Sequence, residues 1–443
     1  MQKIDLLIKN GFILQFNTNK DFFQKKSIII DKGKIIEIGN NEDLSKKYDP
    51  KQIISAKNKI VMPGFVNTHT HLAMSYYKGL ADDLPLMEWL QKHIWPVENK
   101  FMKKELVYNA ALHGAAEMIK NGITTFNDMY FFGDETAQAC EKVGIRAVLG
   151  EGVLDFPVAN YQNANEIFSY IKEMNEKYKD DELIDFAIAP HAIYTCGKEN
   201  LIKAKELASK LDLLLHIHLS ETEKEVNECL KKHILRPVEY LDSLGLFENK
   251  VLIAHGIWMN DKEMEILSQK NISVSINTKS NLKLANGFTP IKKYLKHEVN
   301  LSLGTDGVAS NNNLSMFEEM GIVSTLHKTL NNNPTFLPAE QVVKMATING
   351  AKSLNKEKEI GSIGIGKKAD LILIETNDIC VQPVYNPYSH LVYVITSEQV
   401  KDVIINGKIV MKDRNLINVD EEEMVERAKY YKSKILKFNH IKN

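Results

Sequence analysis

The chain has 443 residues, 44% of them hydrophobic, and its 56 basic side chains nearly balance 57 acidic ones, which gives a formal net charge of −1. A chain of this length and composition can bury a large core and suits one large domain with a smaller companion. The balanced charge offers no broad basic surface for nucleic acid or an anionic membrane, so we expect a small-molecule partner.

The N-terminal stretch, MQKIDLLIKNGFILQF, is interrupted by Lys3, Asp5 and Lys9. It predicts neither a signal peptide nor a membrane span, and no later apolar run is long enough for a span. The four cysteines form no C-x-x-C pair, which argues against a disulfide framework and a thiolate zinc site. We expect a cytoplasmic protein with reduced thiols.

Short β-like runs fill both ends of the chain. Residues 1–60 contain DLLIKNGFIL and SIIIDKGKIIEIG, and residues 361–411 repeat this texture in GSIGIGKKADLILIE and VKDVIINGKIVMK. Because neither end alone could bury a core, we expect both ends to pair in one small β-sandwich domain. The predicted limits of its two parts are 1–60 and 358–443, and the second part includes a C-terminal helix in EEEMVERAKYYKSKILKF.

Between these ends, residues 61–357 alternate apolar β-like runs with amphipathic helical ones. The eight candidate strands span 60–69, 122–128, 145–152, 184–191, 213–220, 251–256, 272–278 and 299–306. Their ends recur about every 34 residues from His69 to Asp306, which suits a βα unit. We therefore predict an α/β fold, a (β/α)8 TIM-like barrel. An open doubly wound sheet is less favoured because no glycine-rich phosphate-binding motif follows the first strand.

Ionisable residues concentrate where these strands end. The strand bodies are largely apolar, whereas the ends carry His69, His71, His191, His218, His255 and Asp306. In a (β/α)8 barrel the carboxyl ends of the strands form the active site. His69 and His71 are two residues apart on a strand and so project to the same face. With His218 and Asp306 they offer the three imidazoles and one carboxylate of a catalytic site for a divalent metal ion.

Several motifs resemble those of the amidohydrolase superfamily, namely PGFVNTHTH, HIHLSET, AHG, SNLKLANG and GTDGVASNNNLSMFEEM. Within it, ASNNNLSMFEEM and YYKGLADDLPLMEWL resemble the 5-methylthioadenosine/S-adenosylhomocysteine deaminase branch. The resemblance covers nearly the whole chain and implies metal-dependent hydrolytic deamination of an adenosine-type nucleoside to the inosine analogue and ammonia. The fourth strand, IDFAIAPH, has no lysine that could be carbamylated to bridge two metals. This fits a single divalent ion, zinc or, as the alternative, iron.

The resemblance also implies roles for individual residues. The metal ligands would be His69, His71, His218 and Asp306. Asp306 would take a proton from the attacking water, which the bound cation acidifies, while Glu221 would protonate ring N1 and help ammonia to leave, and His255 would orient the attacking oxygen. Glu221 has a plainer alternative, because SETE is also typical of a helix N-cap.

Substrate contacts follow from the same resemblance. Glu98, in WPVENKF, matches a residue that accepts hydrogen bonds from both ribose hydroxyls, and His191, in APHAIYT, matches one that contacts the nucleoside. Relatives that take S-adenosylhomocysteine resemble one another in an arginine after the third strand, where this chain has Glu151 in LGEGVLDFP. We expect Glu151 to face the 5′ end of the substrate and to repel a carboxylate there. This favours 5′-methylthioadenosine, 5′-deoxyadenosine or adenosine over S-adenosylhomocysteine.

Other functions stay open at this point. An aminohydrolase acting on guanine, a pterin or an aminotriazine would keep the metal ligands and change the pocket. Glu98 favours a ribose, although it could also be a surface carboxylate. A non-catalytic scaffold on the same fold would be expected to lose ligands, and none is missing. A cytidine-type zinc deaminase needs an H-x-E with a P-C-x-x-C signature, which this chain lacks. The sequence leaves open whether the protein forms a homo-oligomer.

Overall fold

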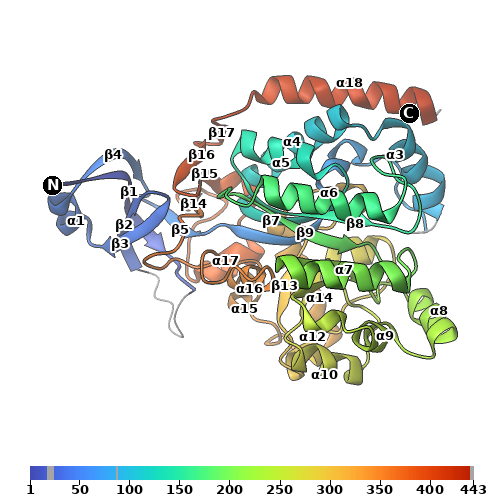
Figure 1. Ribbon diagram of the computed structural model, residues 1–443. Helices are drawn as coiled ribbons and strands as arrows, with labels where there is room; N and C mark the ends of the chain where they lie inside the picture. Colours follow the sequence, from blue (N-terminus) through green and yellow to red (C-terminus); the bar gives the residue numbers. More distant parts are fainter. Residues whose placement is uncertain (17–23, 86–87, 440–443) are drawn as a thin grey trace.

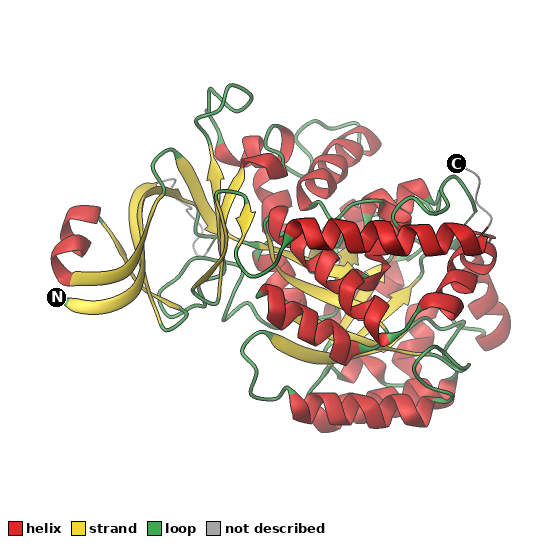
Figure 2. Ribbon diagram, turned by 90° about the horizontal axis from the view of Figure 1, so that it is seen from above, coloured by secondary structure: helices red, strands yellow, loops and turns green. Residues whose placement is uncertain are grey.

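The computed structural model describes residues 1–16, 24–85 and 88–439, which form a barrel and a separate sheet (Figure 1). Eight parallel strands are surrounded by helices, and a nine-stranded sheet built from both ends of the chain lies beside them. Figure 2 shows the two sheets next to each other. Leu86 and Met87 of the motif YYKGLADDLPLMEWL, and residues 440–443 of the predicted C-terminal segment, lie outside the described residues.

The eight parallel strands confirm the predicted (β/α)8 barrel. They lie in chain order, each parallel to the next, which excludes the doubly wound alternative because its strand order reverses part-way. Nearly every strand residue is buried, as expected where helices cover the outside and side chains fill the inside. The strands are β6 (Phe65–Thr70), β7 (Ile123–Tyr130), β8 (Arg146–Val153), β9 (Ile184–Pro190), β10 (Leu214–Leu219), β11 (Val251–His255), β12 (Ser273–Ile276) and β13 (Leu301–Leu303).

Hydrogen bonds involving side chains close the barrel between β13 and β6. Asn67 Nδ2 donates to Thr305 Oγ1 at 2.8 Å, and Thr305 N donates back to Asn67 Oδ1 at 3.0 Å. One residue further on, Asp306 N donates to His69 O at 2.9 Å. Closure therefore places the first and last predicted metal ligands, His69 and Asp306, next to each other. They are distant in the sequence, since Thr70, the residue after His69, is 236 residues from Asp306.

Amphipathic helices cover the barrel. In α6, for example, Ile167, Phe168, Ile171 and Met174 are buried at helical spacing, and Asn163 caps the first turn. The predicted C-terminal helix is α18. Among the described helices, none is both long and apolar enough to cross a membrane. The helices are α1 (Asn41–Lys47), α3 (Trp95–Phe101), α4 (Lys104–Lys120), α5 (Gly133–Val143), α6 (Ala164–Lys177), α7 (Lys198–Leu211), α8 (Glu223–His233), α9 (Pro237–Ser243), α10 (Asp261–Gln269), α11 (Thr278–Lys283), α12 (Ile291–Lys296), α13 (Val308–Asn311), α14 (Met316–Leu330), α15 (Ala339–Met345), α16 (Ile348–Ser353), α17 (Pro387–Tyr393) and α18 (Glu421–Asn439).

Both chain ends contribute to the nine-stranded sheet. Its order is β17-β16-β15-β14-β5-β1-β2-β3, and β4 pairs with β1. Leu6 and Ile30 from the N-terminal part pack in one buried cluster with Leu371 and Ile404 from the C-terminal part, so the two ends share a core as expected. The strands are β1 (Gln2–Ile13), β2 (Gln24–Asp31), β3 (Lys34–Gly39), β4 (Tyr48–Ser55), β5 (Lys59–Pro63), β14 (Leu371–Glu375), β15 (Val400–Ile405), β16 (Lys408–Lys412) and β17 (Asn415–Leu416).

The first predicted boundary differs from the structure. The limit placed after residue 60 falls inside β5, and the predicted strand 60–69 is two strands, β5 in the nine-stranded sheet and β6 in the barrel. Gly64 lies between the two strands, and its N–H donates to Asp370 O. Only glycine fits there, because a Cβ would lie 2.1 Å from the Thr124 side chain. One apolar run therefore contains the crossing between the two sheets.

A buried ion pair joins the barrel to the nine-stranded sheet. Arg146, the first residue of β8, donates from Nε to Asp370 Oδ2 at 2.8 Å and from Nη2 to Asp370 Oδ1 at 3.2 Å. Both side chains are only 2% exposed. Asp370 also accepts from Asn406 N at 2.7 Å. Because loss of one partner would leave an uncompensated buried charge, the pair holds the two units together.

Asp370→Asn keeps the size of the side chain but leaves the Arg146 guanidinium without a counter-charge. We expect it to lower the free energy of unfolding by about 3–5 kcal/mol, measured by urea denaturation. Glu423→Gln is the matched control, because Glu423 pairs with Arg427 on the exposed face of α18, where an ion pair contributes little. Equal unfolding midpoints for the two variants would contradict this interpretation.

Candidate active site

The structure brings the six predicted strand-end residues together at one end of the barrel. They are His69 in β6, His71 just after it, His191 just after β9, His218 in β10, His255 at the end of β11, and Asp306 after β13. The ring centroids of His69, His71 and His218 lie 4.8 to 5.3 Å apart. Five separate βα units thus supply side chains to one cluster.

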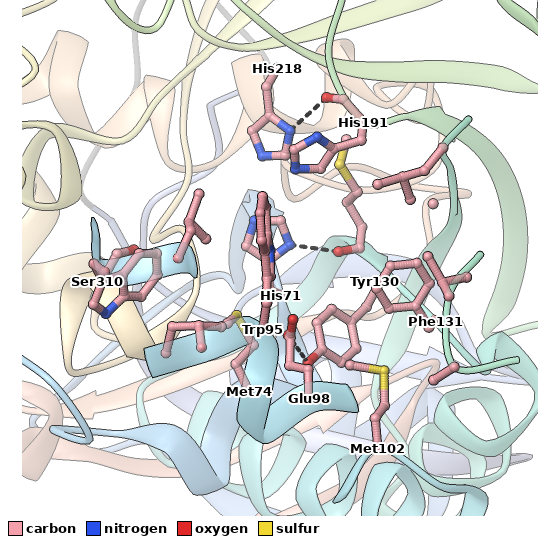
Figure 3. A pocket seen from close by; sticks show the side chains of 18 of the residues that line it. His71, Met74, Trp95, Glu98, Met102, Tyr130, Phe131, His191, His218 and Ser310 are labelled. Atoms are coloured by element: carbon pink, nitrogen blue, oxygen red, sulfur yellow. Dashed lines mark hydrogen bonds between the residues drawn. The ribbon is translucent and has the colours of Figure 1, made fainter. Parts of the chain in front are cut away.

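Main-chain carbonyl groups orient two of the imidazoles. His71 Nδ1 donates to Met129 O at 2.6 Å, and His218 Nδ1 donates to His191 O at 2.8 Å (Figure 3). Because a carbonyl oxygen can only accept a hydrogen bond, both rings carry a proton on Nδ1. When such a ring is neutral, its Nε2 presents a lone pair, which is the arrangement that a metal-ligating histidine needs.

One ring nitrogen of the buried His69 has no hydrogen-bond partner. Its Nδ1 lies 3.1 Å from His216 Nε2, while its Nε2 has no hydrogen-bond partner and lies 3.4 Å from Asp306 Oδ1. Burial lowers the pKa of His69 to about 4, so the ring is neutral near pH 7. A buried polar atom without a partner is costly, and a bound cation would remove that cost.

Asp306 is held by both of its oxygens. Oδ2 accepts from Ser280 Oγ at 2.6 Å and from Ser310 Oγ at 3.1 Å, and Oδ1 lies 3.3 Å from His71 Nε2. Burial opposes ionisation, yet the imidazoles of His69 and His71 hold the pKa of the Asp306 carboxyl well below its usual range. The carboxylate is therefore ionised and fixed, with Oδ1 turned toward the histidines.

Glu221 and His255 face each other at the edge of the cluster. His255 Nδ1 lies 2.8 Å from Asn281 Oδ1, and its Nε2 lies 3.9 Å from Glu221 Oε2. The other oxygen of Glu221, Oε1, accepts from Asn286 Nδ2 at 2.8 Å. Burial raises the pKa of Glu221, which favours a group that can hold and release a proton.

Among the described residues, ligand atoms close enough to share one ion occur in two overlapping groups. The groups are His69 with His71 and Asp306, and His69 with His218 and His255, and the atoms of each lie within 4.8 Å of one another. Imidazole nitrogens and a carboxylate are the ligands that zinc and related divalent ions accept. The residues present therefore fit a metal ion at this position.

A cavity of about 500 Å³ opens over the cluster, and His71, His218, Glu221, His255 and Asp306 line part of it. Much of the remaining wall is apolar and includes Trp89, Trp95, Met102, Phe131, Phe156 and Val158. Figure 3 shows Trp95, Met102 and Phe131 in this wall near Tyr130. No lysine or arginine occurs among the described lining residues.

Both predicted substrate-binding residues line this cavity. Glu98, on α3, accepts a hydrogen bond from Tyr130 Oη at 2.5 Å (Figure 3), and burial raises its pKa to about 7 although this bond opposes the shift. His191 Nδ1 lies 2.8 Å from Thr195 Oγ1, and burial lowers the pKa of its ring to about 3. These two residues thus add a titratable carboxyl group and a neutral imidazole to the cavity wall.

Glu151 does not face the cavity, so the expectation that it meets the 5′ end of a substrate is wrong. Its side chain is buried, and its carboxylate accepts from Phe132 N at 3.1 Å, Gly133 N at 2.9 Å and Asn160 Nδ2 at 2.7 Å. These contacts hold the start of α5 and the loop after β8. The neighbouring Gly152 lines the cavity instead, because successive strand residues point to opposite faces.

Several supporting residues were not predicted from the sequence. They are Tyr130, His216, Ser280, Asn281, Asn286 and Ser310. Three of them, Ser280, Asn281 and Asn286, lie in the single motif SNLKLANG. The sequence signal that could have identified these three residues is the run of short polar side chains directly after the predicted strand 272–278.

Known proteins match the chain over nearly its whole length. The family model described as the amidohydrolase family matches residues 60–410. A 5-methylthioadenosine/S-adenosylhomocysteine deaminase of Thermodesulfovibrio yellowstonii is 44% identical over 431 residues, covering 97% of this chain and 98% of that protein. A 5′-deoxyadenosine deaminase of Methanosphaera stadtmanae is 44% identical over 426 residues, covering 96% and 97%. A crystal structure of a Xanthomonas campestris adenosine deaminase with bound zinc has a TM-score of 0.95 and 36% identity, covering 98% of this chain and 99% of that one. The chain belongs to the amidohydrolase family.

Proposed function

We propose that the protein deaminates adenosine-type nucleosides by hydrolysis and releases the inosine analogue and ammonia. The observation that carries the proposal is one cavity that contains the His/Asp cluster, the Glu221 carboxyl group and, from α3, the Glu98 carboxyl group. The first two are groups for hydrolysis at a ring carbon, and the third suits the hydroxyls of a ribose. The relatives from T. yellowstonii and M. stadtmanae, named as deaminases of such nucleosides, support this assignment.

The metal ligands in this proposal are His69, His71, His218 and Asp306. A bound divalent ion would supply an acidified water, whose pKa falls far below that of bulk water, to about 7 in the best-studied zinc sites. Zinc is the first choice, because the similar X. campestris structure holds it, and iron is the alternative. His255 lies close enough to the cluster to orient the attacking water by a hydrogen bond.

Two carboxyl groups would move the protons. Asp306, ionised and fixed by Ser280 and Ser310, accepts a proton from the attacking water. Glu221 would donate a proton to ring N1 as the oxygen adds to C6. Asp306 would then pass its proton to the amino group, ammonia would leave, and the C6 hydroxyl would return a proton to Glu221. The net reaction adds one water, breaks the C6–N bond and forms a C6 carbonyl group, with no redox change.

Glu98 would bind the ribose. A carboxylate has two oxygens and can accept from two adjacent hydroxyl groups. Tyr130 holds one oxygen of Glu98, which fixes the carboxylate in the cavity wall. Hydrogen bonds from a ribose favour the ionised form, so they also offset the cost of burying its charge.

The apolar wall favours a neutral 5′ group. The amino-acid end of S-adenosylhomocysteine carries a carboxylate that would have to leave water, and the described lining residues provide no lysine or arginine for it. A methylthio or methyl group carries no charge that must leave water and can pack against the apolar side chains of the wall. The preference for 5′-methylthioadenosine, 5′-deoxyadenosine or adenosine therefore rests on the apolar lining and not on Glu151.

If these residues bind the metal, His69→Ala should lower bound metal and turnover together, because both overlapping ligand groups contain His69. Bound zinc would be measured by atomic absorption after dialysis. His233→Ala on α8, which removes an imidazole stacked on Tyr240, is the control and should keep both metal and turnover. Full activity of a metal-free His69→Ala protein would refute this site.

The proton-transfer role predicts that Glu221→Gln retains the metal but loses turnover by ~10²–10⁴-fold, the usual scale for general acid–base catalysis. Glu223→Gln, an exposed carboxyl group at the start of α8, should leave kcat unchanged. A Glu221→Gln protein with normal kcat would return Glu221 to the role of a helix-start residue.

The substrate is tested by measuring ammonia release from purine nucleosides, guanine, pterins and aminotriazines with zinc-loaded protein. We expect kcat/KM for 5′-methylthioadenosine or 5′-deoxyadenosine to exceed that for S-adenosylhomocysteine by ~10–100-fold, the cost of an unpaired carboxylate. Phe156→Arg, which places a cation on the half-exposed part of the cavity wall, should narrow this ratio, and Phe156→Leu should not. Turnover of non-ribosylated rings alone would show that the nucleoside assignment is wrong.

A further inference from the structure

A second carboxyl group, Glu225, lies directly behind Glu221. It is the third residue of α8 and only 4% exposed. Its Oε1 accepts from Ser220 N at 3.0 Å, and its Oε2 accepts from Glu221 N at 2.9 Å. Both oxygens of Glu225 are therefore bonded to the main chain that carries the proposed proton-transfer residue.

The other side of the same main chain is also held. Ser220 O accepts from Ile257 N at 3.0 Å and from Trp258 N at 2.9 Å, in the loop that follows His255. Ser220 has a φ of 52°, in the left-handed region that a residue with a Cβ rarely adopts. Such a conformation is strained and persists only where its surroundings enforce it. Glu225 supplies two of the bonds that enforce it.

Ordinary helix capping accounts for only part of this arrangement. In α9 and α10 the third residue, Glu239 or Glu263, accepts from the N–H of the N-cap residue, which is the usual capping box. In α8 the N-cap Thr222 accepts from Glu225 N at 3.1 Å. The Glu225 carboxyl group interacts with the main chain of Thr222 and reaches, in addition, the two residues before the cap. Its contacts are thus placed where they set the direction of Glu221.

Burial raises the pKa of Glu225 to about 8, which shows that an ionised carboxyl group is costly at this position. The neighbouring Glu221 adds to this cost, since two carboxylates close together repel each other. A polar group without a charge would be cheaper for a helix start alone. The geometry is better explained by a need for two acceptors at the Ser220 and Glu221 amides.

We propose that Glu225 is a positioning residue that aims Glu221 by holding the Ser220 and Glu221 N–H groups. The inference rests on the proposed proton-transfer role of Glu221. Glu221 is aimed between Asn286 Nδ2 and His255 Nε2. Only two methylene groups separate its carboxyl group from the main chain, so a rotation of the Ser220–Glu221 peptide would carry the carboxyl group away from ring N1 of the substrate.

The test compares Glu225→Gln, which keeps one acceptor, with Glu225→Met, which keeps volume but no strong acceptor. We expect kcat to fall in the order wild type, Gln, Met, by ~10–100-fold for Met, because a displacement of about 1 Å can cost this much. KM and bound zinc should stay within about twofold of the wild-type values, as expected for a loss confined to the chemical step. Glu239→Gln, at the same position of α9, is the matched control and should leave kcat unchanged.

The same substitutions in the Glu221→Gln background separate positioning from general stability. If Glu225 acts through Glu221, its substitution should change the residual kcat by less than about twofold in that background. An equal loss in both backgrounds, or a parallel loss of zinc, would overturn the inference. Glu225→Gln carries the comparison if the Met variant does not fold.

Hydrogen exchange gives a readout that needs no substrate. In Glu225→Met, and to a smaller extent in Glu225→Gln, the peptide spanning Ser220 and Glu221 should exchange its amide hydrogens faster than in the wild type, while peptides of β11 stay unchanged. Unchanged exchange at Ser220 and Glu221 would overturn the inference whatever the substrate. A normal kcat for Glu221→Gln would instead count against the proposed function.

Discussion

The candidate active site depends on one property of imidazole: a neutral ring has a single N–H, so the group that holds Nδ1 decides what Nε2 can do. For His71 and His218 that group is a carbonyl oxygen at the end of a neighbouring strand unit, Met129 O or His191 O. The barrel register therefore sets the protonation pattern of the proposed ligands. A strand shifted by one residue would remove the carbonyl and turn the side chain to the other face.

Backbone strain gathers at the same end of the barrel. His255, Asp306 and Ser220 have φ values of 72°, 60° and 52°, each in the left-handed region although none is glycine. Each costs about 1–3 kcal/mol unless its neighbours enforce it. Asp306 N is tied to His69 O across the barrel closure, and Ser220 is tied on both sides of its peptide. The barrel thus supplies the rigidity that these side chains need to stay aimed before any substrate arrives.

Periodicity explains which features could be predicted from the sequence. The eight strands and the histidines at their ends follow from apolar runs that stop at ionisable residues, and the structure has both. The crossing of the chain from the nine-stranded sheet to the barrel at Gly64 was missed. An apolar run has the same sequence pattern whether its residues belong to one sheet or to two. Ser280 and Asn281 in the short helix α11, and Asn286 just after it, were missed because these polar side chains follow no hydrophobic period and their partners Asp306, His255 and Glu221 are distant in the chain.

Glu151 shows why a carboxyl group at a strand end cannot be given a role from position alone. Glu151 and Glu221 both lie at the catalytic end of the barrel and both are buried, but Glu151 faces main-chain N–H groups whereas Glu221 faces His255 and the cavity.

Burial raises the pKa of Glu151 to about 7 and that of Glu225 to about 8, from 4.5 in the unfolded chain. The folded chain therefore keeps protons that the unfolded chain releases, so these two groups make folding less favourable as the pH rises from about 4.5 toward 8. A carboxyl group offers two separate oxygens to neighbouring main-chain N–H groups, and in Glu151 and Glu225 these bonds fix the loops at the cavity end of the barrel.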